Sequence, residues 1–211
     1  RIIAREIKAD TGFVFRHKDT RIGYLAQEAS RYIRENADRP FVLYVNFLEP
    51  HMPFFGPRDD QHDPDEVLLP PNFDALPGPD SPLKARLYQR AYYEQGHSGL
   101  PLRTEADWRR MIANYWGLCS LVDTHAGAIL DTLEACGLSE NTIVVYTSDH
   151  GAMMGSHRLL AKCVMYEEAV RVPMLIRVPP RLQIAPPTVR APVSQVDVVP
   201  TLFYLMGQPI P

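Results

Sequence analysis

Two short segments place chemically capable side chains directly after apolar runs. His51 lies in a proline-flanked loop after the run 41–48, and Asp149 and His150 follow the run 142–147. In an open α/β sheet, ligands bind in loops beyond the carboxyl ends of the strands. An adjacent carboxylate and imidazole form a mixed donor set that suits Ca²⁺, Mn²⁺ or Zn²⁺ better than Mg²⁺. One interpretation of the pair is therefore a divalent-metal site.

The Asp149–His150 pair also has a purely structural interpretation. An aspartate shortly before a glycine, here Gly151, is common in turns, where the carboxylate accepts backbone hydrogen bonds and the glycine takes a positive φ. On spacing alone both interpretations stay open. His157 and Lys162 follow Gly151 closely in the sequence, so an imidazole and an ammonium group are expected near the same strand end. This grouping favours the functional interpretation.

Alternating helices and strands must position these residues. Apolar residues at helical spacing predict helices, and dense β-branched or aromatic runs predict buried strands. Helices are expected at 20–37, 104–136 and 196–206, and strands at 41–48, 142–147 and 172–178. This alternation predicts an α/β fold in three layers, with a largely parallel sheet between helices on both faces.

Residues 54–103 are rich in proline, aspartate and glycine and predict a long surface excursion, with one helical candidate at 83–93. Loops of this length in a compact domain are usually functional or disordered. This one follows a strand end, where substrate-contacting loops tend to lie. We therefore expect the excursion to set substrate choice.

Composition excludes several classes of protein. Of the 211 residues, 45% are hydrophobic and 22% are charged, which is typical of one globular domain. The net charge of -3 and the lack of a Lys/Arg block give no footprint for nucleic acid. The apolar runs are too short for a transmembrane segment. The three cysteines are too scattered for a disulfide framework or a zinc site.

One long stretch carries a specific family resemblance. The segment 147–151, then the Gly-Ser-His at 155–157, then Lys162 and the segment 165–176 together resemble the C-terminal signature of bacterial sulfatases and phosphonate monoester hydrolases. These families belong to the alkaline-phosphatase superfamily. Further agreement comes from 41–53, 115–133 and 193–201, which are similar to a strand with its Pro-His-x-Pro loop and to two helices of the same family.

The resemblance implies a role for each candidate residue. Asp149 and His150 would be metal ligands, with Ca²⁺ as the expected ion and Mn²⁺ or Mg²⁺ as alternatives. Lys162 and His51 would contact the sulfate oxygens or the leaving-group oxygen. His157 would contact the substrate or would hydrogen-bond a metal-ligating residue.

These roles suit sulfate-ester hydrolysis. Charge gathers on the sulfate and bridging oxygens in the transition state, where a cation and an ammonium group stabilise it. A histidine beside the bridging oxygen can protonate the departing alcohol. Taken alone, Lys162 would be a solvated surface charge. Four residues near the signature's end are interpreted as a structural network with ion pairs: Tyr166, Glu167, Glu168 and Arg171.

The family's nucleophile is missing from the sequence. It is a formylglycine made from a Cys/Ser-x-Pro/Ala-x-Arg motif, and none of Cys119, Cys136 and Cys163 lies in such a motif. The family's first strand with its paired aspartates is absent too. We therefore expect residues 1–211 to be a fragment of one sulfatase catalytic domain, lacking the N-terminal nucleophile segment and the C-terminal subdomain, and inactive alone. Exposed sheet edge should favour a homo-oligomer or pairing with a missing segment.

Three hypotheses for function remain at this point. The first is hydrolysis of small-molecule or saccharide sulfate esters by the full-length parent. The second is hydrolysis of phosphonate monoesters or phosphodiesters, since the same Asp-His and Lys arrangement serves both leaving-group classes. The third is a non-catalytic module that binds an anion or a metal. The compartment stays open between cytoplasm and periplasm.

Overall fold

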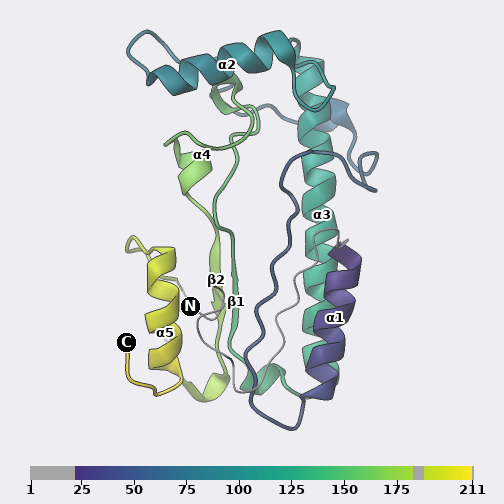
Figure 1. Cartoon of the computed structure of the whole chain (residues 1–211), viewed down its shortest axis with the longest axis vertical. Helices are drawn as coiled ribbons and strands as arrows, with labels where there is room; N and C mark the ends of the chain where they lie inside the picture. The colour runs from purple at the N-terminus through teal and green to yellow at the C-terminus, as the bar shows by residue number, and fades with distance from the viewer. Residues whose placement is uncertain (1–21, 183–187, 211) are drawn as a thin grey trace, which may run out of the picture.

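Two packed helices form one side of the molecule (Figure 1). The computed structural model describes residues 22–182 and 188–210. Helix α1 spans Ile22–Glu35, and helix α3 spans Glu105–Ala135. Both confirm predicted helices, although the first two residues of the predicted range 20–37 lie outside the described residues. The side chain of Thr104 caps α3 by accepting a hydrogen bond from the backbone N–H of Asp107, which is a favoured way to begin a helix.

Only two short strands are assigned among the described residues, and they run antiparallel. Strand β1 (Val144–Thr147) pairs with β2 (Met174–Arg177) in one hairpin-like ladder. The positions of both predicted strands are confirmed. The largely parallel arrangement is wrong for this pair, because residues 148–173 return the chain on the same edge instead of crossing over the sheet.

The segment 41–48 is extended but is not assigned as a strand. No backbone hydrogen bond joins it to β1 or β2 within the described part of the chain. The expectation that it is buried on both faces is wrong too, since burial alternates along it. Val42 and Tyr44 are 85% and 80% exposed, whereas Phe47 packs against α3. One face of the segment thus contacts the helices and the other carries apolar side chains into solvent.

The excursion 54–103 contributes to the core instead of lying loosely on the surface. Phe54, Phe73 and Leu102 are buried against Trp108 of α3. The indole N–H of Trp108 donates to the carbonyl of Leu102 over 3.2 Å, which satisfies the polar atom in this apolar cluster. The excursion also contains η1 (Pro64–Glu66) and α2 (Leu83–Gln95), and α2 confirms the helical candidate at 83–93.

Helix α5 (Val198–Leu205) lies on the other side of β1 and β2 from α1 and α3 (Figure 1). It follows the short turn η5 (Gln195–Asp197) and confirms the predicted C-terminal helix. The remaining short elements are η2 (Ser139–Asn141), η3 (Ser156–Arg158), α4 (Glu167–Val170) and η4 (Pro180–Leu182).

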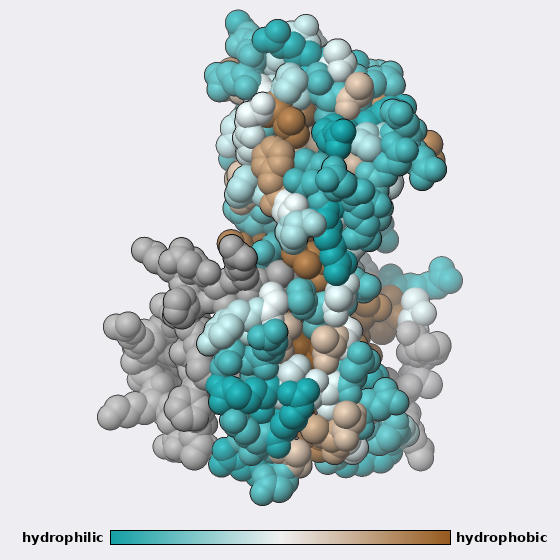
Figure 2. All heavy atoms as spheres, turned by 90° about the vertical axis from the view of Figure 1, so that its right-hand side faces the viewer, coloured by the Kyte–Doolittle hydropathy of each residue, from teal (hydrophilic) through white to brown (hydrophobic). Residues whose placement is uncertain are grey.

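The face formed by α1 and α3 is largely hydrophilic, with small apolar patches between polar side chains (Figure 2). Large exposed apolar side chains also occur on the strands and on α5, including Leu175 and Tyr204 at 62% and 72%. No helix among the described residues has the length and apolar character needed to cross a membrane.

Candidate functional site

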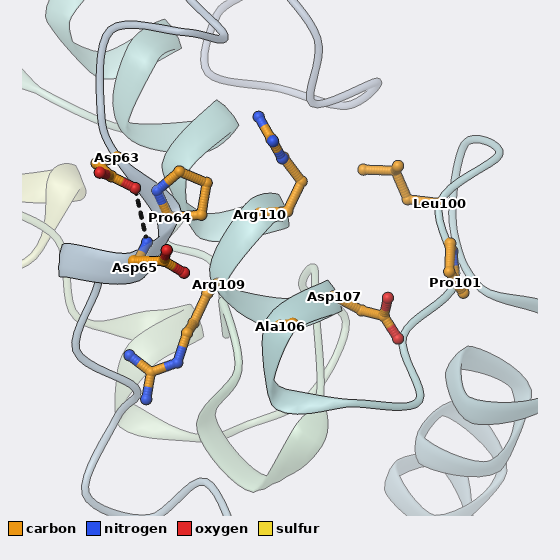
Figure 3. A pocket seen from close by; sticks show the side chains of 9 residues that line it. All are labelled: Asp63, Pro64, Asp65, Leu100, Pro101, Ala106, Asp107, Arg109 and Arg110. Atoms are coloured by element: carbon orange, nitrogen blue, oxygen red, sulfur yellow. Dashed lines mark hydrogen bonds between the residues drawn. The ribbon is translucent and has the colours of Figure 1, made fainter.

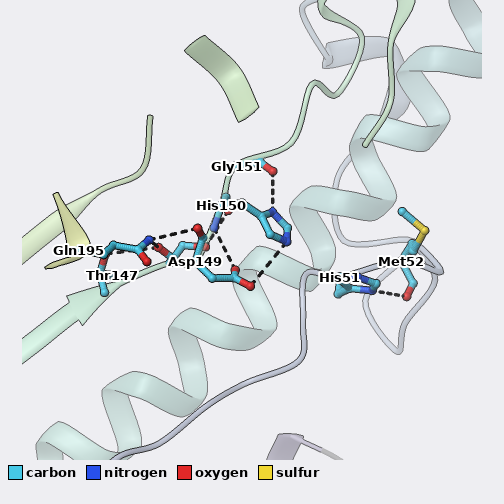
Figure 4. Close-up of polar contacts among 8 residues, drawn as sticks. His51, Met52, Thr147, Asp149, His150, Gly151 and Gln195 are labelled. Atoms are coloured by element: carbon cyan, nitrogen blue, oxygen red, sulfur yellow. Dashed lines mark hydrogen bonds and ion pairs between the residues drawn. The ribbon is translucent and has the colours of Figure 1, made fainter. Parts of the chain in front are cut away.

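The ends of two extended segments meet where the sequence places its candidate residues. In Figure 1 the segment 41–48 and strand β1 run in the same direction. The rings of His51 and His150, which follow these segments, are 6.5 Å apart between centroids. Figure 4 shows His51, Asp149 and His150 in one neighbourhood. Three of the five predicted site residues are thus brought together.

His150 presents one free ring nitrogen beside a carboxylate. Its Nδ1 lies 2.8 Å from the carbonyl oxygen of Gly151, and a carbonyl only accepts, so Nδ1 carries the proton. In the neutral ring the lone pair then resides on Nε2, which lies 3.6 Å from Oδ2 of Asp149 (Figure 4). A ring N–H bound to a backbone carbonyl is the usual way to orient a metal-ligating histidine.

His51 repeats this arrangement from the neighbouring segment. Its Nδ1 lies 2.8 Å from the carbonyl oxygen of Met52, so the proton again resides on Nδ1 and leaves Nε2 as the acceptor. The side chain is exposed, and its ring faces that of His150 at an edge-on angle. An accessible ring nitrogen of this kind is able to exchange a proton with a bound substrate.

The backbone at the end of β1 is held by the side chain of Gln195, from another segment, and by that of Thr147, in β1 itself. Gln195 donates from Nε2 to the carbonyls of Ser148 and Asp149, over 2.5 and 3.1 Å. The hydroxyl of Thr147 donates to the carbonyl of Pro173 over 2.9 Å. These bonds satisfy carbonyls that no strand partner reaches, and they fix the direction in which Asp149 leaves the strand.

Gly151 is required by a close approach of two backbones and not by a turn with positive φ. Its N–H donates to the carbonyl of Ala169 over 2.9 Å, and a Cβ at this position would lie 2.0 Å from the carbonyl oxygen of Glu168. It is not one of the glycines with positive φ. The turn interpretation is therefore only partly right. Oδ1 of Asp149 does accept a hydrogen bond from a backbone N–H, that of His150, over 3.0 Å.

Replacing Gly151 with alanine is expected to lower the free energy of unfolding by about 1–3 kcal/mol, because the added methyl group forces two backbone segments apart. Urea unfolding of the full-length protein measures the change. Gly78 is a matched control, since a Cβ there meets nothing within 4 Å, and Gly78→Ala should stay within about 0.5 kcal/mol of wild type. Equal stability of the two variants would contradict the close approach.

A tight hairpin brings the chain back toward the end of β1 at Lys162. The backbone N–H groups of Met153, Met154 and Gly155 donate to the carbonyls of Ala161, Leu160 and Leu159 over 2.8 to 2.9 Å. This ladder brings Ala161 opposite Met153, three residues after His150. Lys162 is the next residue, and its side chain is half-buried. Its role as an anion contact stays a prediction.

His157 is engaged with the excursion and not with the Asp149–His150 pair. Its Nδ1 lies 2.5 Å from the carbonyl oxygen of Ala75, and its Nε2 lies 3.3 Å from the amide nitrogen of Asn72. Its ring stacks on Tyr166 with centroids 4.5 Å apart. These contacts favour a structural role over the predicted substrate contact.

Two cavities in the described part of the chain lie away from the candidate site. A cavity of about 400 Å³ is lined by the excursion and the start of α3, where Asp63, Asp107 and Arg109 surround it (Figure 3). A second cavity, of about 390 Å³, lies between Arg58 and Thr124. Neither cavity includes a predicted site residue.

The Asp149–His150 pair fits part of a metal shell. A carboxylate oxygen and an unprotonated imidazole nitrogen at 3.6 Å are suitable donors for one divalent ion. The carboxylate of Asp149 is 84% exposed, so it is open to a ligand. No group of three or more His, Cys, Asp or Glu side chains suited to a metal occurs within 22–182 and 188–210. Two protein ligands are few for a hard cation.

Comparison with known proteins identifies the family. The family model named Sulfatase matches residues 16–208, which is nearly the whole chain. The chain belongs to the sulfatase family. It is 33% identical to arylsulfatase K of Bos taurus over 206 residues, covering 93% of this chain and 36% of that protein. It is also 33% identical to the choline-sulfatase of Rhizobium meliloti (strain 1021) over 196 residues, covering 90% of this chain and 36% of that protein.

The solved structures agree with this family. The phosphonate monoester hydrolase SpPMH from Silicibacter pomeroyi matches with a TM-score of 0.75 and 27% identity, over 93% of this chain and 40% of that one. The mixed α/β fold of this sulfatase-family chain therefore corresponds to part of a larger fold that is known from solved structures. The chain spans about a third of the length of the curated relatives cited above.

The sequence alone does not identify Gln195 and Asn72, which support the site. A signal exists for Gln195, since it lies in the segment 193–201 that resembles the family. For Asn72 the only signal was its place among turn residues, which does not reveal a partner 85 positions away.

Proposed function

We propose that the full-length protein hydrolyses sulfate esters, with Asp149 and His150 holding part of a divalent-metal shell and with Lys162 and His51 acting on the ester's oxygens. The supporting observation is the convergence of His51, Asp149 and His150 in a chain that belongs to the sulfatase family. The curated relatives include an arylsulfatase and a choline-sulfatase, which supports small-molecule sulfate esters as the substrate class, with saccharide sulfates as the alternative.

The proposed roles follow from the side chains. Asp149 would contribute a carboxylate oxygen and His150 would contribute Nε2 to the ion, for which Ca²⁺ is proposed and Mn²⁺ or Mg²⁺ is the alternative. The bound ion would supply a positive charge that polarises the sulfate oxygens. Lys162 adds an ammonium charge to the same oxygens. His51, which carries its proton on Nδ1, takes a second proton on Nε2 and delivers it to the departing alcohol.

Two parts of this proposal concern the protein beyond these residues. We propose that 41–48 and β1 are neighbours in a largely parallel sheet of a three-layer fold, which their common direction in Figure 1 supports.

We also propose that the 211 residues alone do not turn over sulfate esters. They contain no Cys/Ser-x-Pro/Ala-x-Arg motif, from which the formylglycine nucleophile would be made.

Hydrolysis of phosphonate monoesters or phosphodiesters is a second candidate function. The observation that favours it is the similarity to the phosphonate monoester hydrolase, at a TM-score of 0.75. Sulfate and phosphonate monoesters both present tetrahedral, anionic centres to a cation and an ammonium group, so the residues of this chain serve either substrate.

Turnover of matched aryl esters by the full-length protein separates the two functions. We expect kcat/KM for an aryl sulfate to exceed kcat/KM for the corresponding aryl phosphonate and phosphodiester. A preference for the phosphorus esters would replace the sulfatase proposal with the second candidate. Absence of turnover for all three esters, in protein that carries the nucleophile and Ca²⁺, would reject both.

A further inference from the structure

One side chain of the excursion contacts both ends of the loop that carries Lys162. The amide nitrogen of Asn72 lies 2.8 Å from Oε1 of Glu168 and 3.3 Å from Nε2 of His157. His157 precedes Lys162 and Glu168 follows it. The backbone also participates, because the N–H of His157 donates to the carbonyl of Asn72 over 3.1 Å. Asn72 therefore closes the loop 157–168.

The hydrogen-bond partners of His157 and Asn72 determine which atoms in this contact carry protons. The ring nitrogen Nδ1 of His157 must donate to the carbonyl of Ala75, so Nε2 is an acceptor in the neutral ring. The carboxylate of Glu168 is an acceptor as well. The NH₂ group of Asn72 has two hydrogens and satisfies both acceptors, whereas its oxygen in the same place would face a carboxylate. Asparagine thus matches this position in both geometry and charge.

Glu168 is stabilised in its charged form by the same contacts. Partial burial raises the pKa of its carboxyl, but hydrogen bonds from the Asn72 side chain, its own backbone N–H and the Ser156 hydroxyl outweigh burial. The net pKa lies below the usual range of a glutamate. Glu168 thus accepts a hydrogen bond from a neutral amide, and its place in a network of ion pairs stays a prediction.

The loop is held in a costly backbone conformation. His157, Arg158 and Cys163 are non-glycine residues with positive φ values of 57°, 50° and 72°. Such residues cost free energy and persist only where surrounding contacts hold them. The stacking of His157 on Tyr166, at 4.5 Å, closes the loop from within. Asn72 closes it from the excursion. Without these contacts the loop would relax, and Lys162 would move with it.

We propose that Asn72, His157 and Glu168 are positioning residues that hold the Lys162 loop closed, so that the excursion contributes directly to the reaction site. The inference rests on the proposed function, in which the ammonium group of Lys162 stabilises charge on the ester's oxygens. Displacing the ammonium group reduces stabilisation of the transition state more than it reduces substrate binding, because the charge develops in the transition state. The closure therefore acts on kcat more than on KM.

A polarity exchange in the full-length protein tests the closure. Asn72→Asp sets two carboxylates against each other and should open the loop. Glu168→Gln alone keeps an acceptor for Asn72 but removes the charge, so it should lower kcat less than Asn72→Asp does. The double variant Asn72→Asp/Glu168→Gln restores one amide and one carboxylate with their places exchanged. Gln95→Glu is the control for added negative charge, since Gln95 is an exposed residue of the same excursion.

Steady-state kinetics with an aryl sulfate and hydrogen exchange of the amides of residues 157–168 are the two measurements. We expect Asn72→Asp to lower kcat by about 10–100-fold with KM within about threefold, and to speed amide exchange. The double variant should recover part of both losses, because it restores the bond between positions 72 and 168 but not the hydrogen bond from position 72 to Nε2 of His157. Gln95→Glu should match wild type.

Unchanged kcat in Asn72→Asp, or a double variant no better than the single one, would overturn the proposal. Hydrogen exchange keeps the two ideas separable, because it needs no turnover. If wild type hydrolyses no ester, the proposed function fails. Unchanged exchange in Asn72→Asp would then overturn the closure as well, and faster exchange that the double variant reverses would support it.

Discussion

Replacing Asp149 with alanine in the full-length protein should lower kcat/KM for an aryl sulfate by about 10³-fold or more and abolish saturable Ca²⁺ binding. A bound metal supplies several kcal/mol of transition-state stabilisation, and each 1.4 kcal/mol is about tenfold in rate. Asp149 is mostly exposed and makes its hydrogen bond to the backbone of His150, so its loss should leave the fold intact. Isothermal titration with Ca²⁺ and initial-rate kinetics measure the two effects.

Asp131→Ala is the matched control for this variant. Asp131 is an exposed carboxylate on α3, away from the strand end. It should bind Ca²⁺ and turn over ester as wild type does. If Asp149→Ala retains wild-type Ca²⁺ affinity and rate, the metal role of Asp149 fails, whatever the rest of the site does.

Lys162→Met should lower kcat by about 10²–10³-fold and leave Ca²⁺ affinity within about twofold. Methionine keeps much of the length and apolar stem of lysine but removes the charge, and losing one electrostatic stabiliser of a developing oxyanion typically costs this much. Lys162→Arg should recover only part of the rate, because a planar fork does not replace a compact ammonium group. The same kinetics and titration measure all three proteins.

Lys84→Met provides the control for loss of a positive charge. Lys84 lies on α2, with its ammonium group 5.5 Å from the centroid of the Tyr88 ring. Its replacement should leave kcat unchanged. A kcat for Lys162→Met within threefold of wild type would show that Lys162 is the solvated surface charge of the simpler interpretation.

The helices could be predicted from the sequence because their signals are local. In α3 the capping residues Thr104 and Asp107 and the apolar spacing all lie within the element. The strand pairing could not be predicted in the same way, since pairing depends on residues far away in the chain. The run 41–48 has the composition of a buried strand, yet its alternate side chains are exposed in this chain.

The same distinction applies to the site. The proximity of Asp149, His150 and His51 can be predicted because each follows an apolar run, and strand ends are where such side chains converge. The contacts of His157 cannot be predicted in this way, because they involve Asn72 and Ala75, which are distant in sequence. The excursion looked like a surface loop because its apolar residues, such as Phe54 and Phe73, are sparse between prolines, although they are buried.

The most direct test of the site is a crystal structure of the full-length protein with Mn²⁺ in place of Ca²⁺, located by its anomalous scattering. We expect one strong peak at coordination distance, about 2.0–2.6 Å, from a carboxylate oxygen of Asp149 and from Nε2 of His150. A sulfate or vanadate bound to that ion should contact His51 and Lys162. A strong peak elsewhere, with Asp149 and His150 free of metal, would contradict the proposed metal site.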